Sequence, residues 1–342
     1  MNSEEGRLAE SAGEIAQQAV AMAVWAPSVH NTQPWWFAAG GRQICLHADT
    51  RRQLLIADPH GREMLISCGA ALFTARLALR CLGYVPETSA LPEPRDPYLV
   101  ARISWPRRAA VTAYESDLAA QVRQRRTHRA GFEALPLPDG LLAALQSGAE
   151  RDGTALHEVS DAGGRAAIAA IAEMAERVLR LDSAQVRELA QWSVPPGSPR
   201  RDGVPPTSYP AHADHTDPAF PGRDFAQGHG WGLPPLSVPA HRSAGTVCLL
   251  TTPDDRPADW LNAGQALQRI LLTAAGHGIA TALHSQPTEV SWLRDNLRAQ
   301  SCDGAWPQLV LRLGAAVQTE QSVRRATADV LRGPGDEAAG SF

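Results

Sequence analysis

The sequence predicts an α+β protein whose single chain contains two related halves. Helical and extended patterns alternate along its 342 residues, and 44% hydrophobic with 20% charged residues is the composition of a soluble globular protein. Residues 62–84 and 259–279 also match each other at a constant offset of 195 positions. The economical interpretation is two α+β halves packed about a pseudo-two-fold axis, as the subunits of a homodimer would be.

The repeat rests on five matched pairs of residues. In the first copy these are Gly69, Ala71, Leu72, Leu77 and Gly83, and in the second Gly264, Ala266, Leu267, Leu272 and Gly278. Both copies share a G-x-A-L core and a glycine stop, and both precede a predicted strand. Their small residues would let the two helices approach closely and form the centre of the molecule. Two unrelated amphipathic helices are the alternative, because Ala and Leu are common residues.

The first half is predicted to occupy residues 1–110. Apolar spacing and turn residues predict, in order, a helix over about 11–27, a strand pair within 35–46, a helix over 62–82, a Pro-rich connection over 86–97 and a strand over 98–103 that breaks at 106–108.

The second half is predicted to occupy residues 111–330, and a flexible tail is expected at 331–342. Its helices are expected at 113–122, 141–145, 260–275 and 291–297, and its strands at 156–159, 246–250, 279–284 and 308–313. Residues 163–192 should form one or two helices with a break near Asp182.

Regular patterns vanish between residues 194 and 239, where Pro, Gly, His and Asp dominate. A segment of this length is either disordered or an ordered lid over a site, and its aromatic residues favour the lid. His212 and His215 form an H-x-x-H pair, with His229 further along. No cysteine lies nearby to complete a zinc site, so surface histidines are expected and no metal is predicted.

Charge and hydropathy exclude several classes of protein. The net charge is −4 and no basic block alternates with aromatic residues, so neither nucleic acid nor a membrane surface is expected as a partner. No apolar run reaches eighteen residues and the N-terminal residues are acidic, which argues against a membrane span or signal peptide and for the cytoplasm. The signatures of Rossmann, P-loop, zincin and α/β-hydrolase sites are absent.

The first candidate site is the polar stretch 26–35, between a predicted helix and a predicted strand. It contains Ser28, His30, Asn31 and Gln33, and polar side chains at a packed junction need partners. Asn and Gln offer paired donors and acceptors, which suit the edge of a flat heterocycle such as a flavin. Alternatively, these side chains only satisfy the helix end and the turn before Pro34.

The second candidate site is a dense positive cluster that follows the helix at 113–122. It consists of Arg123, Arg125, Arg126 and Arg129, with Thr127 and His128 among them. Arginine gives bidentate, charge-assisted hydrogen bonds to phosphate, so this cluster is a candidate receptor for a phosphomonoester, and the pair Arg324-Arg325 is placed to join it. A solvated basic face is the alternative.

The third candidate site is the 285–289 loop, Ser-Gln-Pro-Thr-Glu. Its backbone amides are candidates to face a cofactor, whereas plain helix capping by Thr288 or Glu289 is the alternative.

Together, the three candidate sites resemble the nitroreductase-like flavoproteins, and most closely their Acg-type FMN-binding branch, over about residues 16–325. Residues 125–129 match the Arg-Arg-Ser/Thr-x-Arg motif that binds the FMN phosphate in that family, and residues 26–35 match its Ala-Pro-Ser-x-x-Asn-x-Gln-Pro-Trp motif. The resemblance implies cofactor contacts from Ser28, His30, Asn31, Gln33, Arg125, Arg126, Thr127, Arg129, Gln286, Pro287, Arg324 and Arg325.

The resemblance also implies a function. The arginine motif occurs once, so one FMN per chain is expected, in a monomer that mimics the nitroreductase homodimer. FMN would take a hydride from NAD(P)H and pass two electrons to a small acceptor such as a nitroaromatic or a quinone, with no catalytic side chain identified. The alternatives are an FMN-sequestering or sensing protein whose lid prevents turnover, and a cofactor-free interaction protein.

Overall fold

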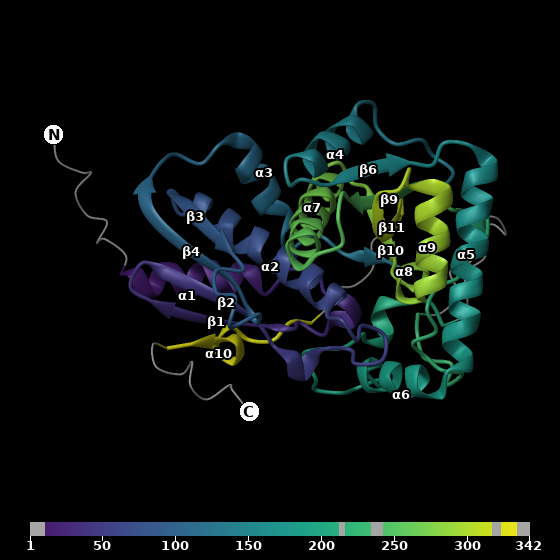
Figure 1. Cartoon of the computed structure of the whole chain (residues 1–342), viewed down its shortest axis with the longest axis horizontal. Helices are drawn as coiled ribbons and strands as arrows, with labels where there is room; N and C mark the ends of the chain where they lie inside the picture. The colour runs from purple at the N-terminus through teal and green to yellow at the C-terminus, as the bar shows by residue number, and fades with distance from the viewer. Residues whose placement is uncertain (1–10, 212–215, 234–241, 317–322, 334–342) are drawn as a thin grey trace.

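Two five-stranded sheets form the framework of the protein (Figure 1). The structure is a computed structural model, and it describes residues 11–211, 216–233, 242–316 and 323–333. The first sheet has the order β12-β1-β2-β4-β3, and the second has the order β5-β10-β11-β9-β6. The strands of the first are β1 (Trp35–Gly40), β2 (Gln43–Ala48), β3 (Tyr84–Ala90), β4 (Leu99–Arg108) and β12 (Leu331–Arg332). Those of the second are β5 (Thr127–His128), β6 (Ala155–Glu158), β9 (Thr246–Thr252), β10 (Ala280–His284) and β11 (Trp306–Gly314).

The two sheets share one topology over four strands each. The antiparallel order β1-β2-β4-β3 corresponds to the antiparallel order β6-β9-β11-β10. Helix α2 (Arg62–Cys81) connects β2 to β3 as helix α7 (Pro257–Gly276) connects β9 to β10. The fifth strand of each sheet runs parallel to its neighbour: β12 pairs with β1, and β5 pairs with β10. The α+β fold class predicted from the sequence is therefore confirmed, with related topology in the two halves.

Helices α2 and α7 pack against each other at the centre of the molecule (Figure 1). A Cβ atom added at Gly69 would overlap the carbonyl oxygen of Leu261, and one added at Gly264 would overlap that of Ile66. Each glycine thus meets the carbonyl group three residues before the other, which is the reciprocity of an isologous contact. The predicted close approach of the two helices is confirmed.

Helix α2 is as apolar as a membrane-spanning helix, but it lies in the core of the protein. It contains no uninterrupted apolar run of eighteen residues, yet its length and mean hydropathy match those of a membrane span, and 83% of its most apolar window is buried inside the protein. Its apolar side chains belong to the first core with those of α1 (Ala12–Ala23) and the first sheet. The second core lies between α7, α4 (Leu141–Glu150) and the second sheet.

The connection between β6 and β9 carries a large insertion, residues 159–245. It begins with α5 (Ala162–Leu181) and α6 (Ser183–Trp192), and Asp182 caps α6 at the predicted break. The described part of the 194–239 segment contains the short elements η3 (Pro206–Ser208) and β7 (Thr216–Asp217), and β7 pairs with β8 (Arg242–Ser243). Buried Val204, Tyr209, Phe225 and Ala226 form a small core of their own. An ordered segment is confirmed for these residues, whereas His212 and His215 lie outside the described residues.

Three predictions about local structure are wrong. The Pro-rich connection contains strand β3, and β4 continues through Pro106 to Arg108. Pro86 and Pro106 both lie where the β3–β4 register shifts. Pro86 is in the edge strand β3, and Pro106 is in the part of β4 beyond its pairing with β2, so neither position needs a residue that donates a ladder hydrogen bond. The 285–289 loop contains a one-turn helix, α8 (Gln286–Glu289).

The C-terminal segment also differs from the predicted tail. Residues 331 and 332 form β12, which is preceded by α10 (Thr327–Val330), while residues 334–342 lie outside the described part of the chain. Helices α3 (Ala113–Gln121) and α9 (Ser291–Ser301) agree with the expected positions.

Candidate functional site

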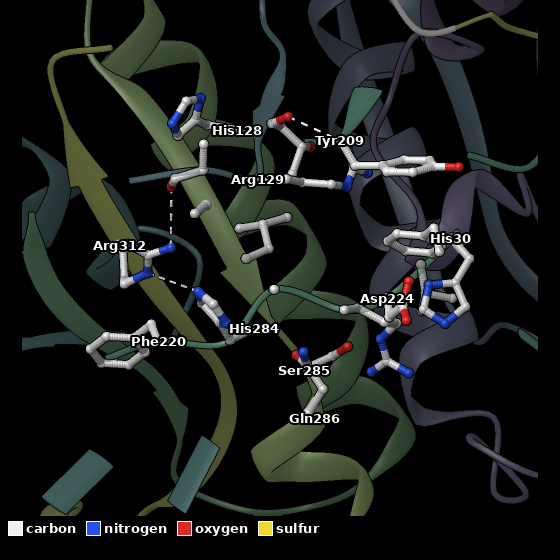
Figure 2. A pocket seen from close by; sticks show the side chains of 18 of the residues that line it. His30, His128, Arg129, Tyr209, Phe220, Asp224, His284, Ser285, Gln286 and Arg312 are labelled. Carbon is white, nitrogen blue, oxygen red and sulfur yellow. Dashed lines mark hydrogen bonds between the residues drawn. The ribbon is translucent and has the colours of Figure 1, made fainter. Parts of the chain in front are cut away.

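A cavity of about 440 Å³ lies between the two halves, and the insertion contributes part of its wall (Figure 2). The first half contributes Ser28, His30, Glu63 and Ser67, and the second half contributes the 127–130 segment and the ends of β10 and β11. Tyr209, Phe220 and Phe225 come from the insertion. The volume lies in the range of about 300–1,000 Å³ that is usual for ligand pockets.

The polar stretch 26–35 reaches this cavity through a turn, η1 (Val29–Asn31), with unusual backbone angles. His30, Asn31 and Gln33 all have positive φ, at 46°, 55° and 49°, although none is glycine. Side chains lock the turn, because Gln33 N–H donates to Ser28 Oγ at 2.9 Å and Val29 N–H donates to Ser67 Oγ at 3.2 Å. Such strained residues concentrate at ligand clamps and active sites.

The four predicted polar residues of this stretch divide into two pairs. Ser28 and His30 line the cavity. Asn31 donates from Nδ2 to the carbonyl oxygens of Gly203 and Val323, while Gln33 donates from Nε2 to that of Arg201. Gln33 Oε1 also accepts from the N–H of Arg325 at 2.8 Å. Asn31 and Gln33 therefore hold the insertion and the C-terminal segment against the turn.

His30 is buried and neutral. Burial, followed by the charges of Arg223 and Arg129, lowers the pKa of His30 well below its ordinary range. Its ring meets the Phe225 ring edge-on, with 5.4 Å between centroids. The histidine thus offers an uncharged imidazole to the cavity, held in place by the insertion.

Four arginines gather where the end of α3 meets the C-terminal segment. This basic cluster consists of Arg125, Arg126, Arg129 and Arg324. Burial lowers the pKa of each side chain, and the neighbouring guanidinium groups lower the pKa of Arg125 and of Arg324 further. The structure therefore brings the second-half motif together with Arg324, one member of the predicted C-terminal pair.

The partners of the basic cluster are neutral. Arg129 donates to the carbonyl oxygen of Ser208 at 3.0 Å, Arg126 to those of Arg123 and Arg125, and Arg125 to Thr127 Oγ1. Among the described residues no carboxylate lies within 4.0 Å of these four side chains, and Nε of Arg125 and of Arg324 has no hydrogen-bond partner there. Buried cations without an acidic partner are costly, and a phosphate group would satisfy them.

Arg325 has a different role from its neighbour. Its guanidinium group donates to the carbonyl oxygens of Gln33, Trp35 and Asp329. It therefore fastens the C-terminal segment to the start of β1, whereas Arg324 belongs to the basic cluster.

A second charged group reaches another part of the cavity wall through Glu63 and Arg223. This carboxylate cluster consists of Glu63, Glu176 and Glu289 with the cations Arg62 and Arg223. Arg223, from the insertion, lies 2.5 Å from Glu289 Oε1 on α8, and Arg62 lies 3.0 Å from Glu63 Oε1. Burial first, and the like charge of Glu289 second, raise the pKa of Glu63 to about 8.

The 285–289 candidate site meets the cavity at one end only. Gln286 lines the cavity and donates from Nε2 to Glu176 Oε2 at 3.4 Å. Pro287 is buried near the start of α8, and Glu289 accepts from Ser285 Oγ at 2.6 Å. Ser285 and Gln286 thus line the cavity, whereas Pro287 does not.

His284 and Arg312 form a buried pair beside Phe220 (Figure 2). Arg312 donates from Nε to His284 Nε2 at 2.8 Å. Because a guanidinium group only donates, Nε2 of His284 is unprotonated and the neutral ring carries its hydrogen on Nδ1. Burial, then Arg312 and Arg223, lower the pKa of His284 well below its ordinary range, which agrees with a neutral ring.

Sequence reasoning missed the carboxylate cluster and the His284–Arg312 pair. Their members lie far apart in the chain, and each looks like an ordinary charged residue within an apolar pattern. The one available signal was the acidic and basic pair Arg62-Glu63 at the start of a helix that is otherwise apolar. Among the described residues, no group of three His, Cys, Asp or Glu side chains is placed to hold a metal ion.

Curated proteins resemble this chain over most of its length. A putative NAD(P)H nitroreductase of Mycobacterium tuberculosis is 37% identical over 308 residues, 89% of this chain and 86% of that protein. The putative NAD(P)H nitroreductase acg of the same species is 30% identical over 314 residues, 90% of this chain and 91% of that protein. No protein-family model matches the chain.

Solved structures give more distant matches. The FMN-dependent nitroreductase NfnB from Mycobacterium smegmatis, in complex with NADPH, aligns with 64% of this chain and 98% of that chain at 19% identity, with a TM-score of 0.38. A nitroreductase with bound FMN from Desulfitobacterium hafniense aligns with 63% of this chain and 96% of that chain at 15% identity, with a TM-score of 0.39.

Proposed function

The chain belongs to the nitroreductase family, with acg among its relatives, and on that basis we propose that it is an FMN-dependent NAD(P)H oxidoreductase. The observation that carries this proposal is the basic cluster: four arginines, most of them buried, that reach the cavity through Arg129 and have no carboxylate partner among the described residues. FMN brings a phosphate to such a cluster and a flat ring to the cavity. Bound FMN would supply the redox chemistry, taking a hydride from NAD(P)H and passing two electrons to an acceptor.

We assign the cofactor contacts as follows. Arg125, Arg126, Thr127, Arg129 and Arg324 bind the phosphate, because they form the basic cluster or line the cavity beside it. Ser28, His30 and Gln286 contact the ring, because they line the cavity. Asn31, Gln33, Pro287 and Arg325 act indirectly, by holding the surrounding segments in place.

We further propose that the chain is a single-chain counterpart of a dimer, with halves at 1–110 and 111–330. The reciprocal contact of Gly69 and Gly264 supports this, as does the shared strand order. The arginine motif occurs in the second half only, so one FMN per chain is expected. The acceptor is a small molecule such as a nitroaromatic or a quinone.

A second candidate function is FMN storage or sensing without turnover. It is favoured by the insertion, whose Phe225 and Tyr209 are buried against the cavity and whose Ser208 carbonyl group accepts from Arg129. If the described part of this insertion keeps its position against the cavity, a nicotinamide cannot reach a bound flavin.

One experiment separates the two candidate functions. Purified protein loaded with FMN is mixed with NADPH or NADH in a stopped-flow instrument, and flavin absorbance is followed. Bleaching by either nucleotide is expected for the oxidoreductase, and bleaching by neither would leave the storage function. A protein that takes up no FMN would reject both.

A further inference from the structure

Glu63 occupies an unusual position for an acidic side chain. It is the second residue of α2, it lines the cavity, and its side chain is only 7% exposed. Arg62 donates to its Oε1 at 3.0 Å, while its Oε2 is buried without a hydrogen-bond partner among the described residues. An ionised carboxylate with one unsatisfied buried oxygen is costly, whereas a protonated one is not.

The groups that face Glu63 do not neutralise it. Glu289 approaches from α8 and Asp58 from the loop before α2, and both carry the same charge as an ionised Glu63. The two cations, Arg62 and Arg223, are shared with other partners. Three carboxylates, those of Glu63, Glu289 and Asp58, thus face two guanidinium groups, and one proton restores the balance. The remaining glutamate of the carboxylate cluster, Glu176, has a cation of its own in Arg180.

Both cations have firm bonds elsewhere. Arg223 is bound to Glu289, which also accepts from Ser285 Oγ. Arg62 donates to Thr288 Oγ1 at 2.9 Å and to the Gln308 carbonyl oxygen at 2.8 Å. Neither guanidinium group can turn to Glu63 alone without breaking these hydrogen bonds.

We propose that Glu63 carries a proton on Oε2 in the resting protein and donates it to the acceptor that is reduced in the cavity. This inference rests on the proposed function. The reaction balances for a quinone: the quinone gains one hydride equivalent from the reduced cofactor and one proton from Glu63, and becomes a quinol. The O–H bond of Glu63 breaks, an O–H bond of the quinol forms, and the carboxylate regains its proton from water.

The geometry allows this transfer. The terminal torsion of a glutamate is soft, so the carboxyl group can turn its protonated oxygen toward the cavity that the side chain lines. Burial and Glu289 raise the pKa of Glu63 to about 8, so the proton is present at neutral pH.

The first arm of the test is infrared spectroscopy of the purified protein, with and without FMN. At pH 7 the wild type should show a protonated-carboxyl band that Glu63→Gln lacks and that titrates with a midpoint of about 8. The control Glu87→Gln, at an exposed glutamate paired with Arg107, should keep the band. A band that is absent at pH 7, or that survives in Glu63→Gln, would overturn the inference.

A second variant keeps the test open if Glu63→Gln does not fold. Glu289→Gln removes the like charge and leaves Arg223 beside Glu63, so the midpoint of the band should fall by about one pH unit or more. An unchanged midpoint would overturn the proposed charge balance.

The second arm measures proton donation. When reduced holoprotein is mixed with a quinone, reoxidation should be about 100-fold slower in Glu63→Gln than in the wild type, as for the loss of a general acid, while Glu87→Gln reoxidises normally. If the wild type shows the infrared band but Glu63→Gln reoxidises as fast as the wild type, proton donation by Glu63 would be overturned. Failure to bind FMN, or to bleach with NADPH or NADH, would reject the proposed function while the infrared result stands by itself.

Discussion

The basic cluster and the carboxylate cluster both reach the cavity, the first through Arg129 and the second through Glu63 and Arg223, but they balance their charges in opposite ways. Arg125, Arg126, Arg129 and Arg324 face carbonyl groups and one another, without a carboxylate within 4.0 Å in the described part of the chain. The carboxylate cluster instead contains its own counter-ions, Arg62 and Arg223. A cluster that lacks a counter-ion is suited to receive one from a ligand, whereas a paired cluster stabilises the fold around it.

The difference follows from which segments supply the residues. The basic cluster joins the end of α3 to the C-terminal segment, and both contribute cations only. The carboxylate cluster joins α2, α8 and the insertion, which contribute both signs. The comparison therefore predicts that mutations in the carboxylate cluster change stability, and that mutations in the basic cluster change ligand binding.

The largest expected effect is on stability, in Arg223→Met. It leaves Glu289, whose side chain is fully buried, without its cation, and the free energy of unfolding should fall by about 3–5 kcal/mol. Urea titration at pH 7 measures it. In the control Arg177→Met, the lost ion pair with Glu173 is exposed and the change should stay below about 1 kcal/mol. Equal losses in the two variants would mean that the buried ion pair stabilises the protein no more than the exposed one.

The next effect concerns FMN affinity. Arg125→Ala or Arg129→Ala should weaken binding by about 2–5 kcal/mol, because each truncates a buried phosphate contact. The exposed Arg123 provides the control Arg123→Ala, which should bind FMN nearly as the wild type does. Fluorescence titration of FMN measures all three. Unchanged affinity in both cluster variants would show that the phosphate binds elsewhere.

FMN binding at the basic cluster should also raise the thermal stability of the protein. FMN at about 100 times its Kd should add about 2.7 kcal/mol to the free energy of unfolding, and the melting temperature should rise with ligand concentration. Arg324→Met removes one mutually repelling charge and one phosphate contact, so at the same FMN concentration as for the wild type it should reduce this gain without destabilising the ligand-free protein. A large loss of stability in the ligand-free variant would show that the cluster already has a counter-ion.

The last effect is a pH dependence in the carboxylate cluster, and its change per pH unit is smaller than the changes above. The folded pKa of Glu63 is about 8 and its ordinary value is 4.5, so between these values the folded state binds more protons than the unfolded state. Its contribution to stability is therefore fully present below about pH 4.5 and is lost as the pH rises toward 8, by at most about 1.4 kcal/mol per pH unit. Urea titrations from pH 5 to 8 should show this slope in the wild type relative to Glu63→Gln. Parallel profiles would contradict it.

The parts of the fold that follow local patterns could be predicted from the sequence. The 195-residue offset identified α2 and α7 as equivalent, and the contact of Gly69 with Gly264 confirms that these helices pack at close range. Strand β3 was missed because Pro86 imitates a loop, and only its pairing with β4 shows that the proline lies at a bulge. Strand β12 was missed because its partner, β1, lies at the other end of the chain.

The residues of the candidate site also divide into those that a local pattern could predict and those that only tertiary contacts bring together. The arginines at 125–129 are contiguous, so composition and the family motif both pointed to them. Asn31 and Gln33 were identified as polar residues in need of partners, but the carbonyl groups that they meet belong to residues 201, 203 and 323. Glu63 and Glu289 are 226 positions apart, and no periodicity relates them.

The pairing of β12 with β1 has a consequence for the order in which the protein folds. Leu331 lies opposite Phe37, and Arg324, just before this strand, completes the basic cluster. Contacts between such distant positions form late and slow folding, because a long loop must close first. The first sheet is therefore completed only when residues 331 and 332 reach β1, and Arg324 then completes the basic cluster. A chain cut before residue 324 would lack both β12 and the Arg324 side chain.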